Sequence, residues 1–338
     1  MRVSTRIVMT CFAVVWCVVS VAGAPLDIGS RRELFVDDFL ISELNGAELE
    51  LKAPCPAGPV LSFDKPWEGL YCGYITIFQD DGKYRMYYRG MPSIGGDNSD
   101  VETTCYAESA DGVHFVKPDL GLFEVHGTRK NNVVLAGMPP FSHNFAPFKD
   151  TRPGVSDDAR YKALAGSSKS GLVAFASPDG LHWRKLREEP VLTEGAFDSQ
   201  NVAFWSAHEQ CYVAYVRTWS EGGFGGFRWV SRATSKDFLE WTEPVEMTKG
   251  DAPWEHIYTN QTVAYFRAPH VYVALAARFM PGRRVLSKAE AAAVGVHEKY
   301  AGDCSDNVLM TSRGGTRYDR TFLEAFVKPG IGLENWTS

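Results

Sequence analysis

Short hydrophobic stretches, separated by polar turns, follow one another along most of the chain. The segment "GYITIFQDDGKYRMYYRG", from Gly73 to Gly90, contains two such stretches joined by an Asp-Gly turn. Alternating or continuous apolar runs of four to eight residues are typical of β-strands. The pattern therefore predicts an all-β chain. A single helix is expected at 287–296, where Ser287 and Glu290 have the spacing of a capping box.

One short motif occurs four times. In each copy a serine is followed six positions later by an aromatic residue, as in "SPDGLHW". Four short strands surround each copy in the same order, and a four-stranded antiparallel sheet repeated radially is a β-propeller blade. The serine and the turn aspartate are expected to bond backbone groups, and the aromatic residue to pack between blades. The four pairs are Ser109 and Phe115, Ser177 and Trp183, Ser235 and Trp241, and Ser312 and Tyr318.

The repeats predict one β-propeller domain over 30–338. The blades are expected at about 68–120, 131–190, 198–247 and 255–322, and 323–338 is interpreted as the connection to a truncated fifth blade. Four blades can also close a ring. In either arrangement, Glu33 to Ile41 is a candidate strand for completing a sheet.

The N-terminus has the pattern of a secretory signal peptide. Arg2 and Arg6 precede the apolar run from Ile7 to Ala24, and cleavage is expected after Ala22. This predicts a signal peptide at 1–22 and a secreted, periplasmic or extracellular protein that does not associate with a membrane after cleavage. The alternative is a retained N-terminal membrane anchor.

Charge and cysteine content limit the function classes. The net charge of -6 argues against a nucleic-acid partner. The five cysteines after the apolar run lack zinc-site spacing, so mostly buried free thiols are expected, with a Cys72–Cys105 bridge as the alternative. No cofactor and no metal site are predicted. A structural calcium ion is compatible with the sequence, but no ligand spacing demands one.

Carboxylates precede the first strands of three blades. In a propeller these strands surround the axis, and the loops leading into them line one mouth. Glycosidic cleavage requires one carboxyl group that protonates the leaving oxygen and a second that acts as nucleophile or base. Glu68, Asp198 and Glu255 are the predicted catalytic acids, with Asp64 as an alternative to Glu68. They predict a glycoside hydrolase acting on an oligo- or polysaccharide.

Other side chains near the same mouth are expected to bind the carbohydrate. Trp67, Trp254 and Tyr258 can stack on sugar faces. His143 and His256 are candidates for wall residues or catalysts, and Arg228 and Arg278 for substrate contacts or structural ion pairs. The predicted substrate-binding residues are Trp67, Asn144, Gln200, Asn201, His256, Tyr258, Asn260 and Glu324.

The blade organisation and the segments "FDSQNVAFW", "SRATSKDFLEW" and "YTNQT" resemble the five-bladed propeller glycoside hydrolases of families 32 and 43. The resemblance is closest to secreted proteins with a family 32 N-terminal-like domain, and it extends from about Leu34 to the C-terminus. It implies Glu68 as nucleophile or base, Asp198 as pKa modulator and sugar binder, and Glu255 as general acid. Blade one lacks the Asn-Asp-Pro of invertases, and "SRATS" replaces Arg-Asp-Pro, which leaves the sugar specificity open.

Two other functions remain open. The first is a non-catalytic carbohydrate-binding propeller that kept the mouth but not the chemistry. The second is a sialidase-like enzyme, because the repeated turn is similar to the sialidase Asp-box although one residue shorter. A sialidase also requires three arginines around a carboxylate and a tyrosine nucleophile, and no such arginine cluster is evident along the sequence.

Overall fold

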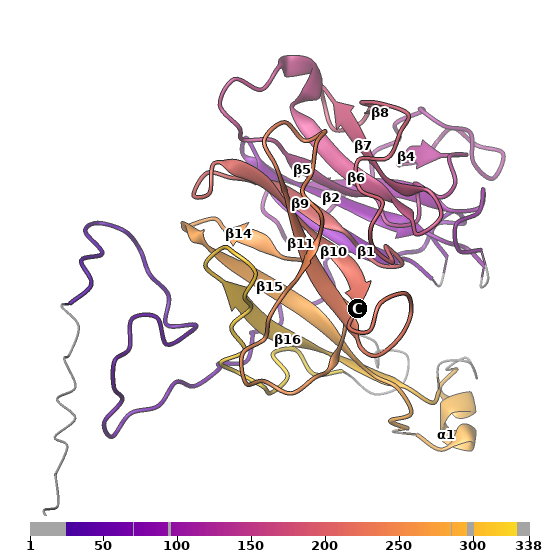
Figure 1. Ribbon diagram of the computed structural model, residues 1–338. Helices are drawn as coiled ribbons and strands as arrows, with labels where there is room; N and C mark the ends of the chain where they lie inside the picture. Colours follow the sequence, from indigo (N-terminus) through magenta and orange to yellow (C-terminus); the bar gives the residue numbers. More distant parts are fainter. Residues whose placement is uncertain (1–24, 70, 94–95, 285, 296–300, 330–338) are drawn as a thin grey trace, which may run out of the picture. The chain divides into compact units, whose positions relative to one another are not determined.

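The computed structural model describes residues 25–69, 71–93, 96–284, 286–295 and 301–329. The chain divides into two units, of which the second begins at Arg32 and contains every strand. Its four sheets are antiparallel, four-stranded and arranged as a β-propeller (Figure 1). The all-β propeller prediction is therefore confirmed. The predicted signal peptide lies outside the described residues, and no helix within those residues is long and apolar enough to cross a membrane.

Each sheet forms one blade, and the strands follow one another in chain order. Blade 1 contains β1 (Gly73–Asp80), β2 (Lys83–Gly90), β3 (Thr103–Ser109) and β4 (Val133–Ala136). Blade 2 contains β5 (Ala146–Lys149), β6 (Tyr161–Ser167), β7 (Gly171–Ser177) and β8 (Arg184–Lys185), with a 3₁₀ turn at Asp157–Ala159. Blade 3 contains β9 (Val202–Ser206), β10 (Cys211–Trp219), β11 (Arg228–Ser235) and β12 (Val245–Glu246). Blade 4 contains β13 (His256–Thr259), β14 (Val263–Tyr265), β15 (Ala268–Met280) and β16 (Cys304–Ser312), and β13 and β14 both pair with β15.

The predicted helix is present as an insertion between β15 and β16. Helix α1 (Lys288–Ala293) begins after Ser287, and both hydrogen bonds of the predicted capping box to Glu290 are formed. It lies apart from the sheets, beyond the ends of β15 and β16 (Figure 1). The five described cysteines are free, and three of them are buried, which matches the expectation of unbridged thiols.

The structure corrects two boundaries. Strand β4 belongs to the sheet of blade 1, whereas residues from 131 onward were expected in blade 2. Residues 33–41 form bends and turns rather than a strand. Their contribution to the ring is ionic, because Glu33 and Asp37 both bind Arg313 of blade 4. Of the predicted fifth-blade connection, 323–329 form no strand and 330–338 lie outside the described residues.

The repeated serine ends the third strand of blades 1 to 3 and the last strand of blade 4, at the last residue of β3, β7, β11 and β16. In blade 2 the Ser177 hydroxyl accepts a hydrogen bond from the Gly180 N–H (2.8 Å), and Asp179 accepts from the N–H groups of Leu181 and His182. Burial by itself raises the pKa of Asp179, but the hydrogen bonds outweigh it and lower that pKa to about 2. The motif is therefore a turn closed by its own side chains.

The aromatic residue of the motif packs toward the preceding blade, as expected. The Trp183 indole donates to the Gly180 carbonyl (3.1 Å) and contacts Phe145 of its own blade, with ring centroids 4.9 Å apart. Its other neighbour is Tyr87 of blade 1, at 6.3 Å. The Tyr87 hydroxyl in turn donates to the Gly180 carbonyl (2.9 Å). The turn is thus also a contact between blades.

A second contact between blades has the same three parts each time, and we call it the tyrosine latch. An acid of one blade binds a basic side chain of that blade and accepts a hydrogen bond from a tyrosine of the next blade. Each latch tyrosine lies opposite the motif serine in its own sheet. The latches are Asp80, Arg85 and Tyr161; Asp150, Lys162 and Tyr212; and Glu209, Arg232 and Tyr272.

The first latch is nearly inaccessible to solvent, since the Asp80 side chain is 4% exposed. It accepts from Arg85 (2.5 Å) and Tyr161 (2.7 Å), and Lys149 lies 2.7 Å away. Burial alone raises the pKa of Asp80, but these hydrogen bonds outweigh burial and lower the pKa to about 2. Removing its charge leaves buried cations without a partner, which is costly.

We therefore expect Asp80→Asn to lower the free energy of unfolding by about 3 kcal/mol at neutral pH. The matched control is Asp81→Asn, next in sequence and 73% exposed, which is expected to change stability by less than about 1 kcal/mol. Urea denaturation of both variants measures the difference. Equal stabilities of the two variants would contradict the latch.

The difference in unfolding free energy between wild type and Asp80→Asn should depend on pH. The folded-state pKa of Asp80, about 2, lies below the value of about 3.9 for an unfolded chain. Its stabilising contribution is therefore complete above about pH 4 and is lost as the pH falls through about 2. The stability gap between wild type and Asp80→Asn should narrow over that window and stay constant from pH 5 to 8.

Gly180 tests the motif contact directly. Its φ is +79°, and a Cβ atom there would lie 2.6 Å from the Tyr87 hydroxyl and 2.8 Å from Arg85 Nη1. Gly154 has a φ of +77° with no atom within 4 Å of such a Cβ. We expect Gly154→Ala to cost about 1 kcal/mol through backbone strain alone. Gly180→Ala should cost at least about 1 kcal/mol more through overpacking, measured by thermal unfolding. A similar cost for both would show that the contact with blade 1 is unimportant.

Candidate functional site

Three of the predicted substrate-binding residues, Asn144, Asn201 and Asn260, are buried, and their side-chain amides form hydrogen bonds to backbone groups. The Asn144 amide nitrogen donates to the carbonyls of Gly166, Phe197 and Ser199. The Asn201 carbonyl oxygen accepts from the Arg217 N–H, and that of Asn260 accepts from the Thr262 N–H. Their exposures are 0%, 0% and 3%, so in this conformation they offer a sugar no surface. They shape the loops before the first strands of blades 2 and 3 and the connection between β13 and β14 in blade 4.

Gln200 is also buried, and it connects blade 3 to blade 1. Its amide nitrogen donates to the Thr76 hydroxyl (2.7 Å), and its amide oxygen accepts from Gln261 of blade 4 (3.1 Å). The Gln200 side chain therefore joins three blades at the first strands. Glu324, by contrast, is exposed on the segment after blade 4.

Glu68 and Trp67 lie in the interior of blade 1. Glu68 is 0% exposed, and its carboxylate accepts from the Tyr88 hydroxyl (2.6 Å) and from Lys117 Nζ (2.7 Å). The Trp67 side chain is 6% exposed, and its indole donates to Asn132 (2.9 Å). Neither side chain can contact a sugar without displacing its neighbours.

Glu255 lies before β13 between two arginines. Its oxygens are 2.6 Å from Arg278 and 2.7 Å from Arg320, and its side chain is 21% exposed. Arg278 also binds Asp306 at 2.7 Å. Glu255 is thus accessible, but both of its oxygens are engaged in a network that also stabilises blade 4.

Asp198, before β9, is the most accessible of the three predicted acids. Its side chain is 38% exposed and lies 3.2 Å from Arg217, which itself is 2% exposed. The preceding residue, Phe197, is fully buried with a positive φ of 52°. A buried aromatic ring at this turn fixes the backbone so that the next side chain points out of the core.

A group of aromatic and charged side chains from all four blades lies around Asp198. Arg217 is 5.2 Å from the Tyr258 ring, and Tyr258 is a close neighbour of Tyr74 of β1. Arg89 lies 4.5 Å over the Tyr74 ring. We call this group the central cluster, and its members are Tyr74, Arg89, His143, Asp198, Arg217, Arg228 and Tyr258.

Tyr74 has a strained backbone at the centre of this cluster. Its φ is +53°, beside an irregularity in the pairing of β1 with β2. Such a conformation costs a tyrosine about 1–2 kcal/mol, and strain of this kind concentrates at functional sites. Burial, and then the neighbouring Tyr258, raise the pKa of Tyr74 well above its usual value, so this phenol is neutral at physiological pH.

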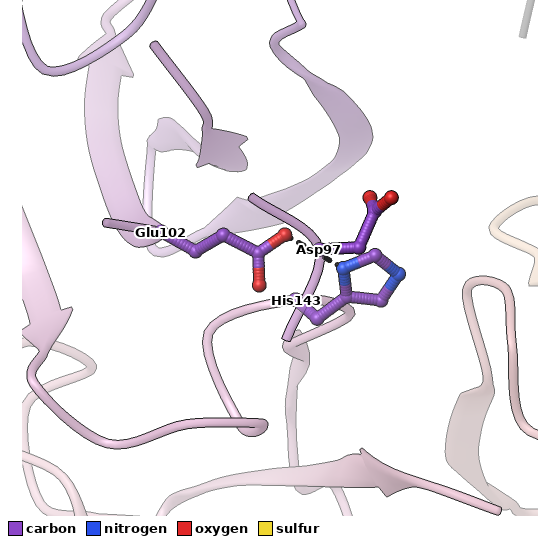
Figure 2. Close-up of side chains that lie close together, drawn as sticks. All are labelled: Asp97, Glu102 and His143. Atoms are coloured by element: carbon purple, nitrogen blue, oxygen red, sulfur yellow. Dashed lines mark hydrogen bonds and ion pairs between the residues drawn. The ribbon is translucent and has the colours of Figure 1, made fainter. Parts of the chain in front are cut away.

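On the other side of Tyr74, His143 is held by a buried carboxylate (Figure 2). The His143 ring lies 5.6 Å from the Tyr74 ring, and Nδ1 is 2.7 Å from Glu102, which is 1% exposed. Because a carboxylate only accepts hydrogen bonds, Nδ1 carries the hydrogen in this pair. Asp97, which is exposed, lies beside the ring in Figure 2.

These three side chains have the composition of a metal site. One potential ligand atom each from Asp97, Glu102 and His143 lies within 4.8 Å of the others. However, Nδ1 is already bonded to Glu102, and Arg89 Nη1 lies 3.4 Å from it. A bound cation would be repelled by that guanidinium. The absence of a cofactor stays a prediction.

Four aromatic side chains extend the cluster outward over blade 3, and we call them the aromatic shelf. Trp219 contacts Phe224 (5.9 Å), and Phe227 stacks on Trp254 (5.8 Å, 17° between planes). Phe224 is 62% exposed and Trp254 39%. His256 joins the shelf to the cluster, because its ring lies 5.0 Å from Phe227 and its Nδ1 accepts from the Arg228 N–H.

The three predicted acids therefore lie in three separate networks rather than in one described pocket. An open cavity of about 690 Å³ on blade 3 is lined by the Ser235 turn with Glu209, Arg232 and Trp241, and its lining includes none of the three acids. Asp198, His256 and Tyr258 are the predicted site residues that meet at the centre.

Sequence reasoning missed Tyr74, Arg89 and Arg217. Arg89 and Arg217 occupy late positions in second strands, in "YYRG" and "YVRTW", rather than the loops before first strands. A charged residue at the end of a buried apolar strand was the available signal. Two arginines meet at one ring, because Arg217 and Arg228 lie 5.2 and 6.0 Å from the Tyr258 ring, a proximity that their positions in the sequence did not reveal.

No protein-family model and no curated protein matches this chain. Among solved structures, the chain is similar to a glycosyl hydrolase from Bacteroides ovatus, at 15% identity and a TM-score of 0.49, over 84% of this chain and 83% of that one. It is similar to a mutant α-L-arabinanase from Cellvibrio cellulosa, at 12% identity and a TM-score of 0.48, over 79% and 85% of the two chains. A third is an N-acetylgalactosamine deacetylase from F. plautii in complex with blood group B trisaccharide, at 15% identity and a TM-score of 0.45, over 73% and 66%. Similarity at this level assigns no activity, and it confirms neither a five-bladed ring nor the family 32 resemblance.

The electrostatics of the cluster are measurable at His256. Burial, and then the charges of Arg228 and Arg217, lower the pKa of His256 below its usual 6.5. We expect Arg228→Gln to raise that pKa and Arg184→Gln, an exposed arginine of blade 2 paired with Asp158, to leave it unchanged. NMR titration of the histidine ring protons gives both values. An unaltered His256 pKa in Arg228→Gln would mean that the guanidinium charge is not felt there.

Proposed function

We propose that this protein is an exported glycoside hydrolase that cleaves O-glycosidic bonds of an oligo- or polysaccharide at the centre of the propeller. The observation that carries the proposal is the accessible Asp198 carboxylate, which Arg217 connects to Tyr258, together with the exposed aromatic shelf. Aromatic faces stack on the apolar faces of sugars, and carboxyl groups supply the acid and base chemistry of glycosidic cleavage. Export is proposed from the N-terminal apolar run.

We assign the chemistry to Asp198 and Glu255. Asp198 is oriented by Arg217, and Glu255, three residues before Tyr258, is positioned by Arg278 and Arg320. In this assignment Glu255 transfers the proton to the leaving oxygen, and Asp198 contacts the sugar and takes a proton from the attacking water, so that the bond to water forms as the glycosidic bond breaks. Glu68 is not included, because it is 0% exposed.

A non-catalytic carbohydrate-binding propeller is the second candidate. One observation favours it: both Glu255 oxygens are held by guanidinium groups, and a general acid must release a proton rather than accept ion pairs. Binding and turnover must therefore be measured separately.

A panel of chromogenic and natural glycans should reveal hydrolysis by the wild-type protein, and its glycan binding is measured in parallel. Asp198→Asn and Glu255→Gln are each expected to lower kcat/KM by about 100-fold or more, with affinity changed far less. Asp158→Asn and Glu188→Gln, exposed acids on blade 2, are the matched controls and should retain full activity. Full activity of Asp198→Asn and Glu255→Gln would refute the assignment, and glycan binding without turnover would establish the binding propeller.

A further inference from the structure

The central cluster carries more positive charge than its surroundings neutralise. Arg217 is paired with Asp198. In contrast, no carboxylate oxygen of the described residues lies within the 4.0 Å ion-pair limit of the Arg89 or Arg228 guanidinium. The Nε atoms of Arg89 and Arg228 and the indole nitrogen of Trp219 are buried without a hydrogen-bond partner there. All three are donors, and buried donors without acceptors are rare in native folds.

Arg228 is held in one orientation by aromatic rings. Its guanidinium carbon lies 4.7 Å from the Trp219 ring and 4.9 Å from the Phe279 ring, with Tyr258 at 6.0 Å. A planar guanidinium between two rings keeps its edge free to donate paired hydrogen bonds. The side chain is partly exposed, so a ligand at the mouth can reach that edge.

The charges that face Arg228 do not balance it. Burial and Arg217 lower the pKa of Arg228, and Tyr258, Asp198 and Asp303 offset this only in part. Arg89 makes no direct ion pair either: its polar neighbours are the Tyr71 carbonyl and His143 Nδ1, and the nearby Glu102 carboxylate is bonded to that same nitrogen. An anion bound at Arg228 would offset the repulsion from Arg217. A cation there would increase it.

We propose that the mouth selects an acidic sugar, whose carboxylate is bound by Arg228 while Arg89 and Arg217 add positive charge. This inference rests on the proposed function in one respect, because it requires a saccharide at the central mouth. The carboxylate is the anion of choice because the guanidinium fork matches its two oxygens. The aromatic shelf, joined to Arg228 through His256, is placed to contact the sugar ring.

General electrostatic attraction does not explain such binding. The chain has a net charge of -6, so its overall field repels an anion. Selectivity for acidic sugars must therefore come from the local arginines, which screening by salt weakens much less than it weakens surface attraction.

Matched ligand pairs isolate the carboxylate. Isothermal titration calorimetry of the full chain is carried out with trigalacturonate and its methyl ester, and with 3′-sialyllactose and lactose. In at least one pair the acidic member should bind about 10- to 100-fold more tightly than the neutral one, the usual gain from charge-assisted hydrogen bonds. Equal binding within both pairs would overturn the proposal, as would tighter binding of glucose 6-sulfate than of glucuronate.

Variants then locate the contact. Arg228→Gln should abolish the preference for the acidic member, and Arg228→Lys, which keeps the charge but not the fork, should retain part of it. Arg267→Gln, an exposed arginine of the β14–β15 turn, should leave it unchanged. Thermal unfolding confirms that each variant is folded. If folded Arg228→Gln kept the full preference for the acidic sugar, the assignment of the contact to Arg228 would be refuted. The comparison of ligand pairs on the wild-type protein tests the proposal even if that variant does not fold.

The outcomes also separate this inference from the proposed function. Tight binding of acidic sugars without hydrolysis of any glycan would support the arginine site and refute the proposed glycosidase activity. Hydrolysis of neutral glycans with no preference for acidic sugars would refute the arginine site and support the proposed glycosidase activity.

Discussion

The hydrogen bond from a tyrosine of one blade to a carboxylate of the preceding blade is the interaction on which the ring depends. The largest apolar cluster is shared by blades 2, 3 and 4, but apolar packing is non-directional and does not by itself set the angle between sheets. A buried carboxylate that binds a cation within its blade and a phenol from the next blade has few alternative partners. It therefore fixes the angle between neighbouring sheets. Asp80, Asp150 and Glu209 hold this position at successive interfaces.

The geometry of the mouth follows from that angle. Tyr74, His143, Asp198 and Tyr258 come from four different blades, so their contacts exist only when neighbouring blades keep their orientation. Inside the mouth the amides of Asn144, Gln200, Asn201 and Asn260 set the loops. Polar residues near the axis thus belong to two sets, one that supports backbone and one that remains available to a ligand.

The sequence was sufficient for the fold because the motif repeats and each copy carries its own turn chemistry. Asp198 lies before a first strand and His256 and Tyr258 lie within one, as the repeat predicted, while their roles in binding or catalysis stay predictions. The sequence could not separate the supporting amides from ligand contacts, because Asn144 and Tyr258 both lie close to a first strand, and only the structure shows that Asn144 is fully buried and Tyr258 partly exposed. Nor could it find Arg89 and Tyr74, whose meeting depends on a positive φ in β1 and on the pairing of β1 with β2.

The ion pairs between the N-terminal segment and blade 4 affect how the chain reaches its final state. Arg313 binds Glu33 and Asp37, which are 280 and 276 residues distant in sequence. Closing a loop of that length costs conformational entropy before the contact returns any energy. Such contacts raise the contact order of the fold and slow its formation. During folding, the segment before blade 1 therefore has no binding site until the last described blade has formed its sheet.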